Sequence, residues 1–190
     1  MRRVIYSMMM SLDGYIARPS GELDWVVITE ELHTFINDRE STIDTHLYGR
    51  RMYEVMAAHW PTADQSPAAP AYEVAYARIW QRMPKVVFST TLDKVEWNSR
   101  LVRDNIAEEV AKLKAQPGKN MGLGGANIAA TFMQLGLIDA CQIYVHPTVL
   151  GSGTPMFPAS DNTLNMRLVE TRTFDSGVVF LSYQRADEGQ

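Results

Sequence analysis

The chain has 190 residues, of which 46% are hydrophobic and 21% charged, the proportions of a globular protein with one sizeable core. Its formal net charge of -4 gives no basic face, which argues against nucleic acid or an anionic membrane as the main partner. Cys141 is the only cysteine, so an internal disulfide is excluded and a cytoplasmic location is expected. No apolar run approaches the roughly twenty residues of a membrane span. We therefore expect one domain over residues 1–190.

The first elements are predicted from apolar runs and capping residues. Val4 to Met10 is nearly continuous in apolar residues, which is typical of a central strand covered on both faces. Asp13-Gly14 interrupts this run, which is too short for a secretion signal, and Tyr15 to Ala17 extends the chain again. Thr29 is a plausible N-cap of a helix with Glu30 and Glu31 in its first turn, where the helix dipole favours carboxylates. Its apolar stripe consists of Leu32, Phe35 and Ile36.

The middle of the chain alternates short strands and helices. Pro61 to Pro70 reads as an irregular surface loop because it is rich in proline. Around it we expect strands over Thr45 to Tyr48 and Lys85 to Ser89. We expect helices over Arg51 to Ala58, Ala71 to Met83 and Asn105 to Ala115. In the first of these helices Met52, Val55 and Met56 should point inward, and Asp104 or Asn105 should cap the last.

The stretch from Lys119 to Phe132 predicts an anion site. A short apolar strand runs into a turn with Gly122, Gly124 and Gly125, and an amphipathic helix follows at once. The first N–H groups of a helix have no internal partner, and residues without side chains let a phosphate approach the main chain. The alternative is a tight turn that needs glycine for positive φ.

From Ala140 onward we expect strands only. Ala140 to Leu150 reads as a long strand, and Arg167 to Phe174 and Val178 to Arg185 read as a hairpin joined by Asp175-Ser176-Gly177. Alternating strands and helices followed by a strand-only tail indicate an α/β fold, mostly parallel with an antiparallel edge.

Four short strings occur in an order that resembles a known family. They are Ser11-Leu12-Asp13-Gly14-Tyr15-Ile16-Ala17, Tyr48-Gly49-Arg50-Arg51-Met52-Tyr53-Glu54, Gly122-Leu123-Gly124-Gly125-Ala126-Asn127-Ile128 and the ten residues from Val149 to Pro158. Together they resemble the dihydrofolate reductase-like family, in particular its branch related to the reductase domain of the bifunctional riboflavin-biosynthesis deaminase/reductase (RibD C-terminal-like). The resemblance implies a single-domain, three-layer α/β fold with a mostly parallel central sheet, an antiparallel C-terminal edge hairpin and helices on both faces.

The resemblance also implies NADPH as cofactor, bound across the carboxyl ends of the strands. A phosphate would lie on the Gly124-Gly125 turn, whose peptide bond is cis in the family, and Arg50 would meet the 2'-phosphate in a forked contact. The structural alternative for Arg50 and Arg51 is a pair of solvated charges at a helix start, where cations are disfavoured. The implied cofactor-binding residues are Gly49, Arg50, Arg51, Ser89, Thr90, Gly122, Gly124, Gly125, Ala126, Asn127 and Ile128.

Two carboxylates are candidates for the catalytic site. Glu31 matches the family's acidic residue and shares a helix side with Phe35; a carboxyl in an apolar pocket has a raised pKa and can act as an acid near neutrality. The alternative is a first-turn carboxylate that stabilises the helix dipole. Asp13 could accept substrate or ribose hydroxyls at the mouth of the site, or could belong only to an Asp-Gly turn.

The function implied is reduction of a small heterocyclic or ribosylated substrate, of the 5-amino-6-(5-phosphoribosylamino)uracil reductase type, by a homodimer. A dihydrofolate reductase is an alternative, weakened because Met52 and Val145 stand where folate enzymes usually have threonine. A non-catalytic nucleotide-binding protein on the same fold is the other. The four histidines show no metal-ligand spacing with each other or with Cys141, so we expect no metal site.

Overall fold

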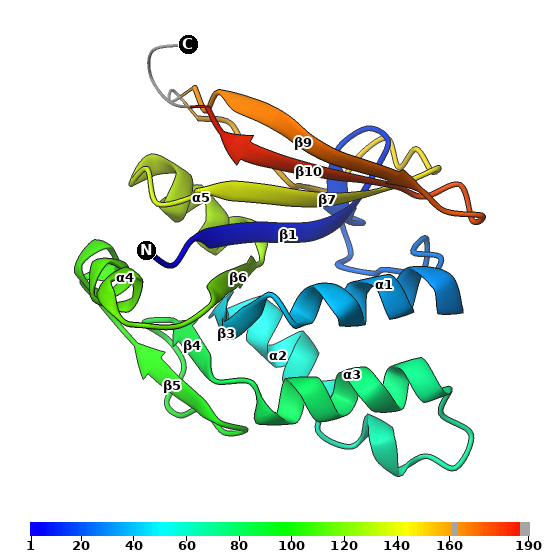
Figure 1. Cartoon of the computed structure of the whole chain (residues 1–190), viewed down its shortest axis with the longest axis horizontal. Helices are drawn as coiled ribbons and strands as arrows, with labels where there is room; N and C mark the ends of the chain where they lie inside the picture. Colours follow the sequence, from blue (N-terminus) through cyan, green and yellow to red (C-terminus); the bar gives the residue numbers. More distant parts are fainter. Residues whose placement is uncertain (161–162, 187–190) are drawn as a thin grey trace. The chain divides into compact units, whose positions relative to one another are not determined.

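The computed structural model describes residues 1–160 and 163–186, and its contacts divide the chain into two compact units, each discontinuous in sequence. The first unit consists of Met1–Arg2 and Thr29–Gly125, and the second of Arg3–Ile28 and Ala126–Gln190. Figure 1 labels most of the helices and strands of both. The single domain over residues 1–190 stays a prediction.

The first unit contains four parallel strands in the order β5-β4-β3-β6. These are β3 (Ile43–Gly49), β4 (Lys85–Phe88), β5 (Ser99–Val102) and β6 (Asn120–Gly124). Gly49 is the register partner of Phe88, and Tyr48 that of Gly124. The carboxyl ends of these strands therefore lie at one edge, from which the loops that carry function usually leave.

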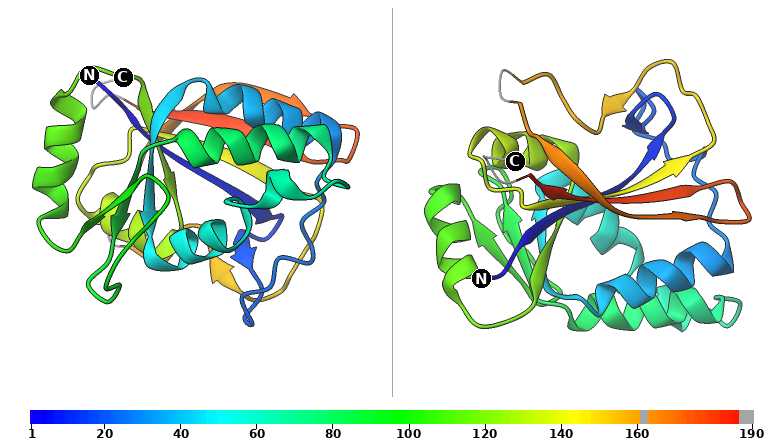
Figure 2. Two further views of the ribbon diagram at one scale, coloured as in Figure 1. Left: turned by 90° about the horizontal axis from the view of Figure 1, so that it is seen from below. Right: turned by 45° about the horizontal axis from the view of Figure 1, so that its top comes forward.

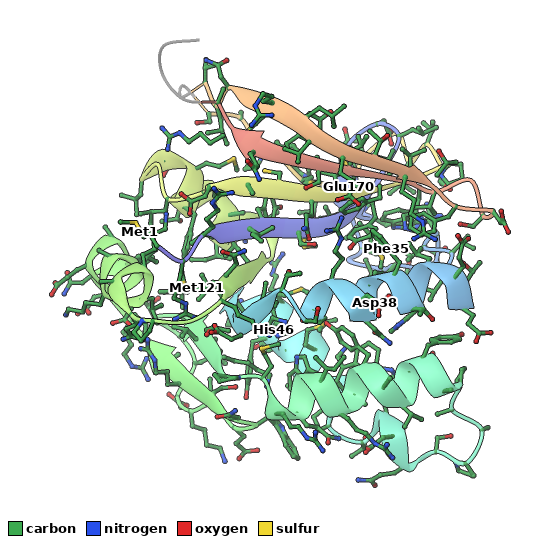
Figure 3. All side chains as sticks on the ribbon, viewed as in Figure 1. Met1, Phe35, Asp38, His46, Met121 and Glu170 are labelled. Atoms are coloured by element: carbon green, nitrogen blue, oxygen red, sulfur yellow. The ribbon has the colours of Figure 1, made fainter. Side chains whose placement is uncertain are left out.

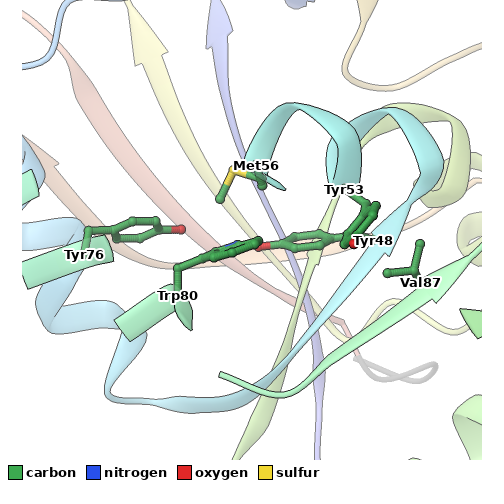
Figure 4. Packing of buried hydrophobic residues seen from close by; sticks show 6 residues of the cluster. All are labelled: Tyr48, Tyr53, Met56, Tyr76, Trp80 and Val87. Carbon is green, nitrogen blue, oxygen red and sulfur yellow. The ribbon is translucent and has the colours of Figure 1, made fainter. Parts of the chain in front are cut away.

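Helices cover both faces of this half of the sheet. They are α1 (Glu30–Glu40), α2 (Arg50–His59), α3 (Ala71–Arg82) and α4 (Ile106–Ala115), with a short 3-10 turn η1 (Ala63–Gln65) in the proline-rich loop. On one face Tyr48 and Val87 pack with α2 and α3 in a cluster completed by Tyr53, Met56, Tyr76 and Trp80 (Figure 4). The opposite face carries Thr45. The Arg2 guanidinium donates one hydrogen bond to Thr45 Oγ1 and another to the Leu113 carbonyl of α4.

Two details of the helices differ from the sequence prediction. Val55 is exposed, so the prediction that it points inward is wrong; Tyr53 and Met56 are the buried residues of α2. Asn105 is the N-cap of α4, but it has left-handed backbone angles (φ 52°, ψ 41°) and its side chain does not cap the helix. The predicted cap of α1 is confirmed, because Thr29 Oγ1 accepts from the Leu32 N–H at 3.3 Å.

The second unit carries strands in the order β1-β7-β10-β9. β1 (Val4–Ser11) and β7 (Ala140–His146) are parallel, whereas β10 (Val179–Arg185) and β9 (Met166–Thr173) form an antiparallel hairpin (Figure 2). β2 (Tyr15–Ala17) pairs with β8 (Thr154–Pro155), and α5 (Ala126–Gln134) follows the glycine stretch. β7 ends at His146 and not at Leu150 as predicted, since Pro147 has no N–H to donate to a ladder. The α/β class with parallel strands and an antiparallel C-terminal hairpin is confirmed.

Candidate functional site

The carboxyl edge of the strands in the first unit brings most of the predicted cofactor residues together. Gly49 ends β3, Ser89 and Thr90 follow β4, and Gly124 ends β6. The register partners at these ends are Gly49 with Phe88 and Tyr48 with Gly124. Residues that lie up to 75 positions apart in the sequence, from 49 to 124, thus share one edge.

The start of α2 is open to an anion. Gly49, its N-cap, is extended (φ -82°, ψ 170°) and has no side chain to accept from the first amides of the helix. Arg50 and Arg51 follow at once and are exposed. Arg50 Nη1 lies 3.5 Å from Glu54 Oε1, and both side chains are about half exposed. Such a surface pair is weak, so the guanidinium can exchange Glu54 for a phosphate.

The three glycines of the predicted anion site have different roles. Gly122 and Gly124 lie within β6, and only Gly125 has a positive φ (103°). The turn interpretation therefore holds for Gly125 alone. No peptide bond among residues 1–160 and 163–186 is cis, so the cis Gly124-Gly125 bond that the resemblance implied is wrong.

Gly122 and Gly124 make room for side chains of the neighbouring strand β3 and of helix α2. A methyl group at Gly124 would lie 3.2 Å from Met52 Cε and 3.3 Å from Tyr48 Cε1. One at Gly122 would lie 2.9 Å from Ile43 Cδ1 and 3.5 Å from His46 Cδ2. The two glycines are thus explained by packing within the first unit.

The hydroxyl residues after β4 form a turn. Ser89 Oγ accepts from the Thr91 and Leu92 N–H groups at 3.2 and 3.1 Å, and its hydroxyl can still donate. Arg103 Nη2 donates to the Leu92 carbonyl at 2.7 Å, which holds the same turn. Thr90 is exposed at its tip.

The three remaining cofactor candidates open α5 and belong to the second unit. Ala126 and Ile128 are buried and Asn127 is exposed. Ala126 and Ile128 can therefore offer a ligand only their backbone, whereas Asn127 can also offer its amide side chain.

The two candidate carboxylates lie in different units. Glu31 is in the first turn of α1 and is exposed. Asp13 accepts hydrogen bonds from Ser11 Oγ (2.6 Å) and from the Leu150 and Gly151 N–H groups (3.0 and 2.7 Å). The Ser11 bond first, and then the backbone bond from Leu150, lower the pKa of Asp13 from 3.8 to about 2. Asp13 is therefore an ionised acceptor that ties two loops together.

Sequence reasoning missed two buried polar groups in the first unit. His46 on β3 bonds to Glu40 and to Tyr48. Lys85 is 1% exposed, and its Nζ donates to the carbonyls of Trp80 (2.5 Å), Met83 (2.8 Å) and Trp97 (2.9 Å). Burial lowers the pKa of Lys85 from 10.5 to about 8.

A cavity of about 740 Å³ lies at the opposite, amino edge of the same strands. Its lining includes Arg2, Asp44, Lys85, Trp97 and Arg100. It contains none of the residues predicted to bind the cofactor or to act in catalysis. Among residues 1–160 and 163–186, His, Cys, Asp and Glu form no group of three or more that could hold a metal ion. In the same part of the chain, every helix is too short or too polar to cross a membrane.

Comparisons with known proteins define first the fold and then the family. The chain is similar to a dihydrofolate reductase from Enterococcus faecalis complexed with NADP(H) and RAB-propyl, with a TM-score of 0.65 and 16% identity over 97% of each chain. It is also similar to a putative riboflavin biosynthesis protein from Shewanella sp. PV-4, with a TM-score of 0.77 and 22% identity over 97% of this chain and 99% of that one. These likenesses confirm the dihydrofolate reductase-like fold.

Residues 2–180 match the RibD C-terminal domain family. The uncharacterized protein YyaP of Bacillus subtilis (strain 168) is 37% identical over 183 residues, which cover 96% of this chain and 94% of YyaP. The chain therefore belongs to the RibD C-terminal domain family, as its four sequence strings predicted.

Proposed function

We propose that this protein is an NADPH-dependent reductase that transfers a hydride to a small heterocyclic or ribosylated substrate. The observation that carries the proposal is the carboxyl edge of the first unit, where the uncapped start of α2, Arg50, Arg51, the hydroxyls after β4 and the Gly125 turn gather. Amides and arginines at a helix start are suited to phosphate groups. Membership of the RibD C-terminal domain family and the likeness to an NADP(H)-bound reductase support it.

The residues present fit such a cofactor. Arg50 and Arg51 would hold the 2'-phosphate of the adenosine, with Ser89 and Thr90 as further donors, and the amides of α2 and of the Gly125 turn would hold the other phosphates. When bound, the nicotinamide supplies the hydride. The protein would then supply orientation, exclusion of water and one proton.

Glu31 is exposed and does not lie in the apolar pocket that was expected from the sequence, so its candidacy for that proton rests on its match to the family's acidic residue. The lowered pKa of Asp13 makes it a poor donor near neutrality. Its carboxylate already accepts one hydrogen bond from Ser11 Oγ and two from the amides of residues 150–151. We propose Glu31 as the acid and Asp13 as a positioning residue. The substrate class nearest to the family is a ribosylamino-pyrimidine. A cytoplasmic homodimer stays a prediction, which light scattering at working concentration would test for the dimer.

A turnover assay tests this proposal. NADPH consumption is followed with pterins, flavins and ribosylamino-pyrimidines as acceptors, in the wild type, Glu31→Gln and Glu30→Gln. Glu30 is the matched control, since it is exposed in the same helical turn. We expect Glu31→Gln to lower turnover by about 10²-fold or more with unchanged cofactor binding, and Glu30→Gln to leave turnover unchanged. Turnover in Glu31→Gln equal to wild type across pH would refute the acid role, and no turnover with any acceptor class would count against the reductase.

A further inference from the structure

A buried chain of hydrogen bonds runs from α1 to the end of β3 within the first unit. His46, labelled in Figure 3, lies between Glu40, the last residue of α1, and Tyr48. Its Nε2 is 2.8 Å from Glu40 Oε2, and its Nδ1 is 2.7 Å from the Tyr48 hydroxyl. The exposed fractions are 3% for both His46 and Tyr48 and 14% for the Glu40 side chain.

The protons of this chain can be placed so that each of its two hydrogen bonds has one donor and one acceptor. A carboxylate can only accept, so His46 Nε2 carries a proton and donates to Glu40. His46 Nδ1 of the neutral ring is then an acceptor, and the Tyr48 hydroxyl donates to it. Burial, and then the charge of Glu40, raise the pKa of Tyr48 well above its ordinary value, which keeps the proton on the phenol.

Both rings of the chain lie against the glycines of β6. His46 is the register partner of Gly122, and Tyr48 that of Gly124. A methyl group at Gly124 would stand 3.3 Å from Tyr48 Cε1, and one at Gly122 would stand 3.5 Å from His46 Cδ2. The ring centroids of His46 and Tyr48 are 5.1 Å apart. The Tyr48 ring also packs with Trp80 and Val87 in the cluster of Figure 4.

We propose that the chain Glu40–His46–Tyr48 is a positioning device that fixes the carboxyl end of β6, and with it the Gly125 turn, for the phosphate of a dinucleotide. The proposal rests on the proposed function for the identity of the ligand. Tyr48 is held at its hydroxyl by His46, and it is the register partner of Gly124, the last residue of β6. A change in the orientation of Tyr48 would therefore be transmitted to Gly124. None of the three residues touches the cofactor. They act through Gly124, one residue before the only glycine of this stretch with positive φ.

The experiment compares Tyr48→Phe with Tyr53→Phe. Tyr53 is the matched control because it belongs to the same cluster and is 7% exposed. Its hydroxyl bonds to the backbone of Glu96 (2.7 Å from the amide nitrogen) and not to a residue of the chain Glu40–His46–Tyr48. Three quantities are measured: the ¹⁵N shifts of the His46 ring, the hydrogen exchange of the Gly124 and Gly125 amides, and the affinity for NADPH. A second pair, Glu40→Gln and Glu40→Ala, tests rescue, because the glutamine carbonyl can still accept from His46 Nε2.

We expect the wild-type ring to give the shifts of the neutral Nε2–H tautomer. Tyr48→Phe should shift the Nδ1 signal of His46 and raise the hydrogen-exchange rate of the Gly124 and Gly125 amides about tenfold. It should also weaken NADPH binding about three- to tenfold, which is the effect of losing one buried hydrogen bond. Glu40→Ala should do the same and Glu40→Gln much less. Tyr53→Phe should leave all three quantities unchanged.

Two results would overturn the inference. One is exchange and affinity in Tyr48→Phe equal to wild type, and the other is an equal effect of Tyr53→Phe, which would indicate a general loss of stability. If the wild type binds no NADPH, the proposed function fails, but the His46 shifts and the exchange at Gly124 and Gly125 still decide whether the chain positions the turn.

Discussion

Replacing the two glycines of β6 one at a time separates packing from ligand binding. In Gly124→Ala the new methyl group would meet Met52 Cε at 3.2 Å, Met52 Cγ at 3.3 Å and Tyr48 Cε1 at 3.3 Å. Two of these are atoms of one side chain packed against the core cluster, and the third belongs to a ring fixed by His46. In Gly122→Ala the only contact below 3.4 Å is with Ile43 Cδ1, the far end of a flexible side chain, at 2.9 Å.

The expected free energies of unfolding follow from these contacts. Overpacking a well-packed site costs about 1–3 kcal/mol, and replacing glycine by alanine in a strand returns about 0.5–1 kcal/mol. Gly124→Ala should therefore destabilise the protein by about 1 kcal/mol net, the difference between the middles of these two ranges. Gly122→Ala should lie within about 0.5 kcal/mol of wild type, because Ile43 can change rotamer.

Urea unfolding of the two variants measures this difference. Equal midpoints for Gly124→Ala and wild type would refute the packing argument, and so would a larger cost for Gly122→Ala than for Gly124→Ala. If Gly124 instead serves only to let a phosphate approach, Gly124→Ala will keep its stability and lose NADPH affinity alone.

Two further predictions concern buried and paired charges. The unfolded chain keeps the Lys85 proton up to about pH 10.5, whereas the folded chain releases it from about pH 8. The free energy of unfolding of wild type, relative to that of Lys85→Met, should therefore rise between these pH values by up to about 3 kcal/mol. A difference that stays constant with pH would contradict the lowered pKa of Lys85. Asp13→Ala should accelerate hydrogen exchange at the Leu150 and Gly151 amides, whereas Asp24→Ala, which removes an exposed ion pair with Arg18, should not. In wild type the protection of these two amides should be lost as the pH falls from 3.8 towards 2, because Asp13 becomes protonated. Unchanged exchange in Asp13→Ala would refute the proposal that Asp13 holds the loop at residues 150–151.

The elements that could be predicted from the sequence have strong local signals. Thr29 was identified as a cap because its hydroxyl satisfies an amide of the first turn, and the apolar runs of β1 and β4 marked buried strands. β5 (Ser99–Val102) was missed because four residues with two polar members carry too little periodicity. Its place is set by pairing with β4, which is a tertiary effect.

Which motifs touch each other could not be read from their order. Asp13 of the first string bonds to Leu150 and Gly151 of the fourth, and a methyl group at Gly153 would lie 2.1 Å from the Ala17 carbonyl oxygen. In the same way Tyr48 of the second string is the register partner of Gly124 in the third. Each pair is brought together by strand pairing between segments distant in sequence.

The buried polar groups were missed for a different reason. Lysine is mostly exposed in proteins and histidine is intermediate, so neither residue type predicts full burial. Only the fold supplies the partners that make burial tolerable, which are Glu40 and Tyr48 for His46 and three backbone carbonyls for Lys85. The segment that offers one of those carbonyls holds Trp97 and Asn98 at left-handed φ values of 61° and 55°. The sequence around Trp97 and Asn98 has no local signal for that conformation.

The most direct test of the central claim is a calorimetric titration with NADPH and with NADH in moderate salt, on wild type, Arg50→Ala and Arg78→Ala. Arg78 is the matched control, an exposed arginine on α3 of the same unit. We expect wild type to bind NADPH more tightly than NADH. Arg50→Ala should lose about 10- to 100-fold in NADPH affinity with little change in NADH affinity. Arg78→Ala should bind both cofactors as wild type does. Equal affinities for the two cofactors, unchanged by Arg50→Ala, would contradict the assignment of Arg50 to the 2'-phosphate, and binding of neither would contradict the reductase itself.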